Sequence, residues 1–230
     1  MPKPTRPRPL RGRPTRPGPR RASLPPELVD EVRRAARRGR AEEALASLGR
    51  AVELLGRGDA RGAAAEAAKA KELAPRSAAV REVLGLALYA GGRYREALSE
   101  MQAYRRISGR PDQNHIIADC LRAVGKPERA VPLAEEALAA RIPLEHKAEA
   151  AIVAAAALRD QGRFDEALAL LRRLPTRDDV GRDWALRVWY VAADILERAG
   201  RRDEAAREFR KILRHDQAAF DVAERLAQLG

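Results

Sequence analysis

Five alanines recur along the chain at nearly constant spacing. They are Ala63, Ala97, Ala130, Ala167 and Ala205, separated by 34, 33, 37 and 38 residues. Each has a glycine five residues before it, a leucine nine before it and a small residue twelve before it. The residues four and seven after each alanine are apolar or aromatic. A period of this length indicates an array of stacked supersecondary units.

The repeating positions match the physical needs of a helix–turn–helix unit. The glycine ends the first helix, since the residue after a helix often needs positive φ. The alanine and the small residue allow two antiparallel helices to cross closely, and the leucine fills the seam between them. No segment from Glu27 to Leu229 alternates with the period of a strand. The pattern therefore predicts an all-α fold stabilised by stacking.

Several local motifs resemble the tetratricopeptide repeat family. They are Gly92-Arg93-Tyr94-Arg95-Glu96-Ala97-Leu98, Gly162-Arg163-Phe164-Asp165-Glu166-Ala167-Leu168, Gly200-Arg201-Arg202-Asp203-Glu204-Ala205, Leu84-Gly85, Trp189 and Pro75. The resemblance covers residues 41–217. It implies a right-handed α-solenoid of about five helix–turn–helix repeats, with an extra N-terminal helix over 27–38 and a C-terminal capping helix over 220–229. The chain also resembles bacterial repeat proteins of actinobacteria that carry a Pro/Arg-rich N-terminal tail.

The basic charge is concentrated at the N-terminus. The chain has 45 Lys and Arg against 33 Asp and Glu, a net charge of +12. Residues 1–24 contain eight of these cations, seven prolines and no acid, so residues 25–230 carry only +4. Such a segment buries too little apolar surface to offset its ordering entropy. We expect a disordered tail over 1–24 and a repeat domain over 25–230.

The tail contains one motif that suggests a nucleic-acid role. Arg11, Gly12 and Arg13 precede Pro14 and resemble the core of an AT-hook, which lies in the minor groove of A·T-rich DNA. The motif departs from that family at Leu10, where proline is usual. Weak nonspecific attraction to polyanions and a merely solubilising tail are the alternatives.

No pattern of catalytic or metal-binding residues is found in the sequence. It lacks a Walker loop, a dinucleotide fingerprint, H-E-x-x-H and G-x-S-x-G. The single cysteine, Cys120, rules out a disulfide framework and a multi-cysteine metal site. Its place one residue before a seam leucine predicts a buried core thiol rather than a reactive one. We therefore expect no enzyme, cofactor or metal. No apolar stretch approaches the ~20 residues of a membrane helix, so we expect a cytoplasmic protein without membrane association.

The resemblance places the first helix of each repeat on the concave surface. Residues 18, 15, 11, 8 and 7 positions before the repeated alanine share one face of that helix. In the first repeat this face is apolar, so we expect the helix over 27–38 to cover it. In the other four repeats it carries seven acids and four arginines, and is thus mildly acidic. One interpretation is a solvated face with local ion pairs.

The favoured interpretation is a scaffold that binds a partner peptide or helix in this groove. Tyr and Arg would anchor the partner, because these types dominate interface energetics. The candidate contact residues are Glu82, Tyr89, His115, Asp119, Arg122, Glu149, Arg159, Arg187, Tyr190 and Asp194. The alternative is a nucleic-acid-associated protein that uses the tail.

The tail hypothesis predicts that DNA binding depends on residues 1–24. The full chain should bind labelled duplexes in fluorescence polarisation, with an affinity that falls steeply as salt rises, and deletion of 1–24 should abolish binding. Preference for an A·T-rich over a G·C-rich duplex would support minor-groove recognition. Equally poor binding by both proteins at low salt contradicts the hypothesis.

Overall fold

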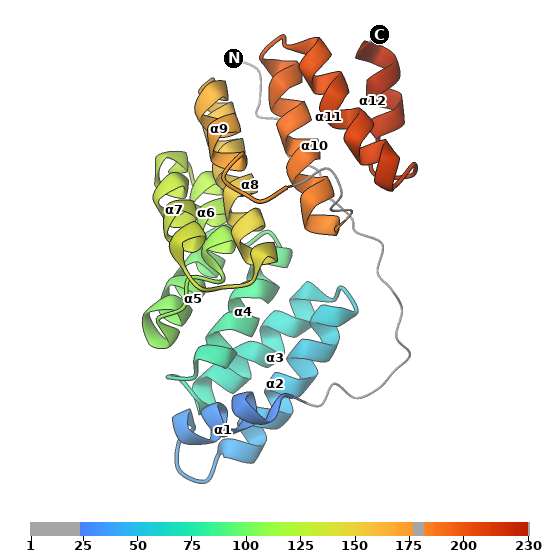
Figure 1. Ribbon diagram of the computed structural model, residues 1–230. Helices are drawn as coiled ribbons and strands as arrows, with labels where there is room; N and C mark the ends of the chain where they lie inside the picture. Colours follow the sequence, from blue (N-terminus) through green and yellow to red (C-terminus); the bar gives the residue numbers. More distant parts are fainter. Residues whose placement is uncertain (1–23, 177–181, 230) are drawn as a thin grey trace.

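The computed structural model describes residues 24–176 and 182–229, which form twelve α-helices, one short 3-10 helix and no strand. Figure 1 shows helical hairpins stacked in chain order, from α1 at one end to α12 at the other. The predicted all-α solenoid is confirmed. The tail, including Arg11, Gly12 and Arg13, lies outside the described residues.

The array consists of five hairpins. Their first helices are α2 (Ala41–Gly56), α4 (Ala78–Ala90), α6 (Asn114–Ala123), α8 (Leu144–Asp160) and α10 (Asp183–Arg198). Their second helices are α3 (Ala60–Leu73), α5 (Tyr94–Ser108), α7 (Ala130–Ala139), α9 (Phe164–Leu171) and α11 (Arg202–His215). Each second helix packs against the first helix of its own hairpin and against that of the next, which makes one continuous core.

The repeated small residues lie where the paired helices cross. All five repeated alanines are fully buried. On the first helix of the second hairpin, α4, the small residue at the crossing is Gly85. A Cβ added to Gly85 would lie 2.9 Å from the Met101 side chain on α5. A larger residue there would push the two helices apart. The five glycines that precede the second helices all have positive φ, between 72° and 82°.

The third hairpin differs from the others at its turn. A 3-10 helix, η1 (Pro127–Arg129), stands where the other repeats begin their second helix, and α7 starts only at Ala130. Proline at the start of this turn lacks the N–H donor, and its ring fixes φ. The second helix of repeat three is shorter than those of repeats one, two and five, although Ala130 and Ala134 keep their buried positions.

The N-terminal helix α1 spans Pro26–Ala35. The sequence predicted a helix over 27–38, and the observed helix ends three residues earlier than predicted. The helix ends because Ala36 adopts extended backbone, after which the Arg37 N–H donates to Leu73 O at 2.8 Å. α1 packs against α2 and α4, and Val32 is fully buried. Glu31 accepts hydrogen bonds from Ser77 Oγ and the Ala78 N–H, both at 2.6 Å.

The C-terminal helix α12 spans Val222–Leu229 and packs against α11. The sequence predicted that it begins at Phe220. That residue has φ of 51°, in the left-handed region, and therefore cannot belong to a right-handed helix. The chain turns at Phe220 and Asp221 before α12 begins.

The first helices form the inner layer of the array. Consecutive first helices from α2 to α10 are in direct contact, whereas consecutive second helices approach each other less closely within the described residues. In a curved stack the more closely spaced layer lies on the inside. We call the surface formed by the first helices the inner face.

The turn of the second hairpin allows a direct test of the backbone requirement. Gly92 has φ of 72°, while its neighbour Gly91 has φ of −80°. Gly92→Ala should lower the free energy of unfolding by about 1–2 kcal/mol, because a Cβ strains the left-handed conformation. Gly91→Ala should leave it unchanged or raise it by up to about 1 kcal/mol. Urea denaturation followed by circular dichroism measures both, and equal effects would contradict the assigned turn.

Candidate functional site

The charged side chains of the inner face form two rows that cross the first helices. The C-terminal row lies near the helix ends and comprises Tyr89, Asp119, Arg122, Asp160, Arg159, Asp194 and Arg225. The N-terminal row lies near the helix starts and comprises Glu82, Gln113, His115, His146, Glu149 and Arg187. Every neighbouring pair of first helices from α4 to α10 is therefore bridged twice.

The C-terminal row is a continuous chain of hydrogen bonds and ion pairs. The Tyr89 hydroxyl donates to Asp119 Oδ2 at 2.6 Å. Arg122 donates to Asp119 Oδ1 at 2.7 Å and to Asp160 Oδ2 at 3.2 Å. Arg159 then donates to Asp160 Oδ1 at 2.8 Å and to Asp194 Oδ2 at 2.6 Å. Each arginine thus joins carboxylates of two successive helices.

The row ends on α12, through a residue that the sequence did not indicate. Arg225 Nη2 donates to Asp194 Oδ1 at 3.0 Å and to Glu197 Oε2 at 2.6 Å. Its Nη1 donates to the Tyr190 hydroxyl at 3.2 Å, and its guanidinium lies 5.3 Å from the centre of the Tyr190 ring. The capping helix therefore completes the inner face, and Tyr190 joins the row through Arg225.

The N-terminal row contains shorter, separate contacts. Gln113 Nε2 donates to Glu82 Oε1 at 2.6 Å, which links the start of α6 to α4. The rings of His115 and His146 lie 5.9 Å apart between α6 and α8. Arg187 Nη2 donates to Glu149 Oε2 at 2.7 Å between α10 and α8. All ten residues predicted as the site are thus held by partners within the chain.

Burial is the main cause of the pKa shifts in the N-terminal row. It raises the pKa of Glu82, with the hydrogen bond from Gln113 acting in the opposite direction. It also raises the pKa of Glu149, opposed by the charge of Arg187. Burial and the neighbouring His146 lower the pKa of His115 to about 4. His115 is therefore neutral at pH 7 and contributes no charge to the inner face.

The inner face is closer to neutral than the sequence indicated. Asp112, one of the seven predicted acids, is buried and instead binds the Tyr104 hydroxyl at 2.8 Å and Arg110 at 2.6 Å. Arg225 adds a fifth arginine to the predicted four. The inner face therefore carries six carboxylates and five arginines. The ion pairs between them fit the interpretation of a face with local ion pairs.

No group of three or more His, Cys, Asp or Glu side chains with a metal-binding arrangement occurs among the described residues. Cys120 is fully buried, and burial raises the pKa of its thiol to about 12. It is therefore a protonated core residue at neutral pH, as its place one residue before the seam leucine Leu121 predicts.

The repeat geometry and the comparisons with known proteins agree. Sequence models of the tetratricopeptide repeat match residues 48–111 and 116–219, which is most of the chain. The chain belongs to the tetratricopeptide repeat (TPR) family. This assignment confirms the resemblance seen in the motifs around the five alanines.

Solved TPR structures share the fold. YrrB, described as a TPR protein with an unusual peptide-binding site, is 21% identical with a TM-score of 0.56, covering 81% of this chain and 93% of its own. TTC0263, a thermophilic TPR protein of Thermus thermophilus, is 19% identical with a TM-score of 0.57, covering 81% of this chain and 98% of its own. MamA is 17% identical with a TM-score of 0.60, and the match covers 80% of this chain and 95% of MamA. At these identities the likeness concerns the fold. A search of curated proteins finds no match.

None of the helices in residues 24–176 and 182–229 is long and apolar enough to span a membrane.

The C-terminal row should contribute to stability in a pH-dependent way. Burial acts to raise the pKa of Asp194, but Arg159, Arg198 and Arg225 outweigh it and hold the pKa below its usual 3.8. The interaction therefore stabilises the fold above pH 3.8 and is lost as the pH falls through the lowered pKa. Arg159→Met should lower the free energy of unfolding by about 1–3 kcal/mol at pH 7 and by less at pH 3.

Arg163→Met is the matched control, because Arg163 pairs with Glu166 at 2.7 Å on the exposed surface. It should cause no measurable change. Urea denaturation at pH 7, 5 and 3 compares the two variants. A loss for Arg159→Met that is the same at every pH would show that packing, rather than the ion pair, accounts for it.

Proposed function

We propose that this TPR protein is a scaffold that binds a segment of a partner protein, as a peptide or helix, along the inner face of α4, α6, α8 and α10. The observation that carries the proposal is the continuity of this face. The C-terminal row runs across four successive first helices as an unbroken chain of hydrogen bonds and ion pairs, and the separate contacts of the N-terminal row join the same four helices. Such a surface can contact a segment of a partner over several repeats, as the TPR family does with proteins and peptides.

The space between the rows offers apolar contacts. Leu86 lies on α4 between Glu82 and Tyr89, and Ala156 lies on α8 between Glu149 and Arg159. Both are partly exposed. The rows are largely neutralised internally, so a partner gains little by bringing a strong net charge. The inner face therefore favours an amphipathic segment with small or apolar residues over a highly charged one.

The same geometry disfavours a C-terminal carboxylate as the ligand. The family's carboxylate clamp needs cations that are free to bind the terminal group. Here Arg122 and Arg159 each donate to two carboxylates of the chain. A partner's carboxylate would have to displace aspartates that are already in place. YrrB, which shares the fold and is described as having a peptide-binding site, is in keeping with a peptide as the ligand.

A blocking substitution tests the proposal without breaking either row. Ala156→Arg places a long cation between the rows and should release proteins that co-purify with the full chain from its host. Ala139→Arg, on the exposed side of α7, is the matched control and should retain them. Retention by both variants would contradict binding along the inner face.

The predicted anchors need a separate experiment. Tyr89→Ala, Arg122→Ala and Tyr190→Ala should each weaken capture of the same partner by about tenfold or more, the effect expected of an interface hot spot. Circular dichroism must first show that each variant stays folded, since each side chain also bridges helices. If all three folded variants capture the partner as the wild type does, these residues make no contact with it.

A further inference from the structure

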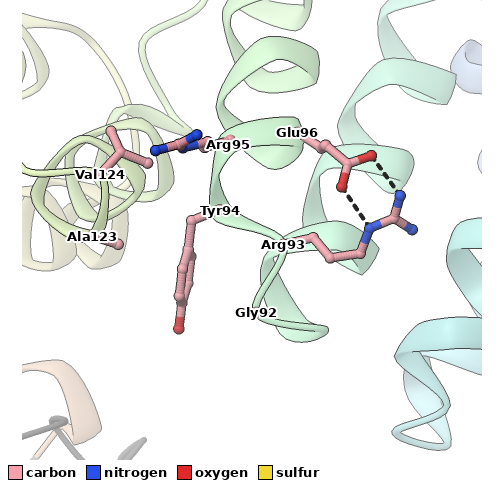
Figure 2. A pocket seen from close by; sticks show the side chains of 7 residues that line it. All are labelled: Gly92, Arg93, Tyr94, Arg95, Glu96, Ala123 and Val124. Carbon is pink, nitrogen blue, oxygen red and sulfur yellow. Dashed lines mark hydrogen bonds and ion pairs between the residues drawn. The ribbon is translucent and has the colours of Figure 1, made fainter.

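A hollow opens beside the inner face, at the turn of the second hairpin. It has a volume of about 420 Å³ and is lined by Gly92, Arg93, Tyr94, Arg95, Glu96, Ala123 and Val124. Figure 2 shows the Tyr94 ring pointing into open space next to Ala123. None of the lining residues belongs to either polar row. The hollow adjoins the inner face at Ala123, the last residue of α6, without sharing its polar side chains.

The hollow coincides with the irregular third repeat. Tyr94 stands three residues before its repeated alanine, and Phe164 occupies that position in the fourth repeat. Phe164 is partly buried against the core, whereas Tyr94 is 38% exposed. The third repeat has η1 in place of a regular helix start, and it follows directly on the α6 end that borders the hollow. An aromatic ring is thus more exposed here than at the same position of the fourth repeat.

Neighbouring contacts hold the exposed ring in place. The Tyr89 and Tyr94 rings meet edge to face, with centroids 5.8 Å apart. Tyr89 is itself fixed by its 2.6 Å hydrogen bond to Asp119. A ring ordered in advance loses little conformational freedom on contact, which favours its use in binding.

The two arginines at the rim of the hollow differ in their pairing. Arg93 donates to Glu96 through both Nε and Nη2, at 2.7 and 2.5 Å. Arg95 forms no ion pair with any residue in the described part of the chain, and in Figure 2 it extends the other way, toward Val124. The hollow therefore combines an apolar floor of Tyr94, Ala123 and Val124 with an available guanidinium at its edge.

We propose that this hollow is a second docking site, which accepts a large apolar side chain of a partner protein together with an adjacent carboxylate. The apolar side chain would lie against Tyr94 and Val124, and the carboxylate would pair with Arg95. The hollow is open to solvent and cannot enclose most of a free small molecule, as ligand pockets do. A projecting side chain of a protein segment fits it better. The site does not depend on binding at the inner face.

The test uses capped peptides of defined sequence and the full chain labelled for NMR. The probes are Ac-Ala-Trp-Asp-Ala-NH2, Ac-Ala-Trp-Lys-Ala-NH2 and Ac-Ala-Ala-Asp-Ala-NH2, titrated into the millimolar range. The Trp-Asp peptide should shift the resonances of Tyr94, Arg95 and Val124 and bind at least several-fold more tightly than either other peptide. Shifts confined to Leu86, Ala156 or Tyr190 would place binding on the inner face and overturn the proposal.

Variants separate the two parts of the site. Tyr94→Ala should weaken the Trp-Asp peptide by about tenfold, while Tyr94→Phe keeps the ring and should bind normally. Arg95→Glu should reverse the preference between the Asp and Lys peptides. Ile107→Ala, an exposed apolar residue on the same helix, and Arg61→Glu, at the equivalent position of the first repeat, are the controls and should change nothing. Equal binding by Tyr94→Ala and wild type would refute the site.

Discussion

The close crossing of two antiparallel helices at a small residue is the contact on which the rest of the structure depends. At each of the five crossings an alanine is fully buried, and at Gly85 even one additional carbon would meet Met101. The crossing requires the chain to reverse within a few residues. A glycine with positive φ makes this possible in every repeat. The short turn and the small crossing residue together define the hairpin, and the stacking of hairpins then buries the core.

The polar rows add a second kind of coupling between repeats. In a solenoid each unit contacts only its neighbours, so stability is approximately a sum of unit and interface terms. The arginines of the C-terminal row belong to these interface terms, because each joins carboxylates of two successive helices. Arg225 extends the coupling to the last helix. The side chains that would contact a partner are therefore the same ones that connect the repeats, and the inner face is ordered before any partner arrives.

The two ends and the irregular third repeat show where local rules are insufficient. The helix over 27–38 was predicted from its pattern, but it ends at Ala35, where Ala36 turns to extended backbone and Arg37 hydrogen-bonds to the end of α3. The start of α12 was predicted at Phe220, but that residue turns the chain. The hollow at Tyr94 also has no signal in its own motif, which matches the family well. It lies where the second hairpin meets the third, whose turn is irregular.

The sequence by itself determined the repeat, the all-α fold, the turn glycines and the crossing alanines. These follow from local conformational preference and from periodicity, both of which can be read along the chain. The expectation that the ten candidate side chains lie on the concave surface came from the resemblance to the TPR family. Only the tertiary structure decided the partners of those side chains. Arg122 could have paired with several acids, and its choice of Asp119 and Asp160 depends on the spacing and tilt of α6 and α8. Two further residues also depend on the tertiary structure. Arg225, on α12, pairs with Asp194 and so becomes part of the inner face. Asp112 was expected on that face but is buried against the Tyr104 hydroxyl instead. The net charge of a surface depends on such distances in space, and these are set by how the hairpins stack.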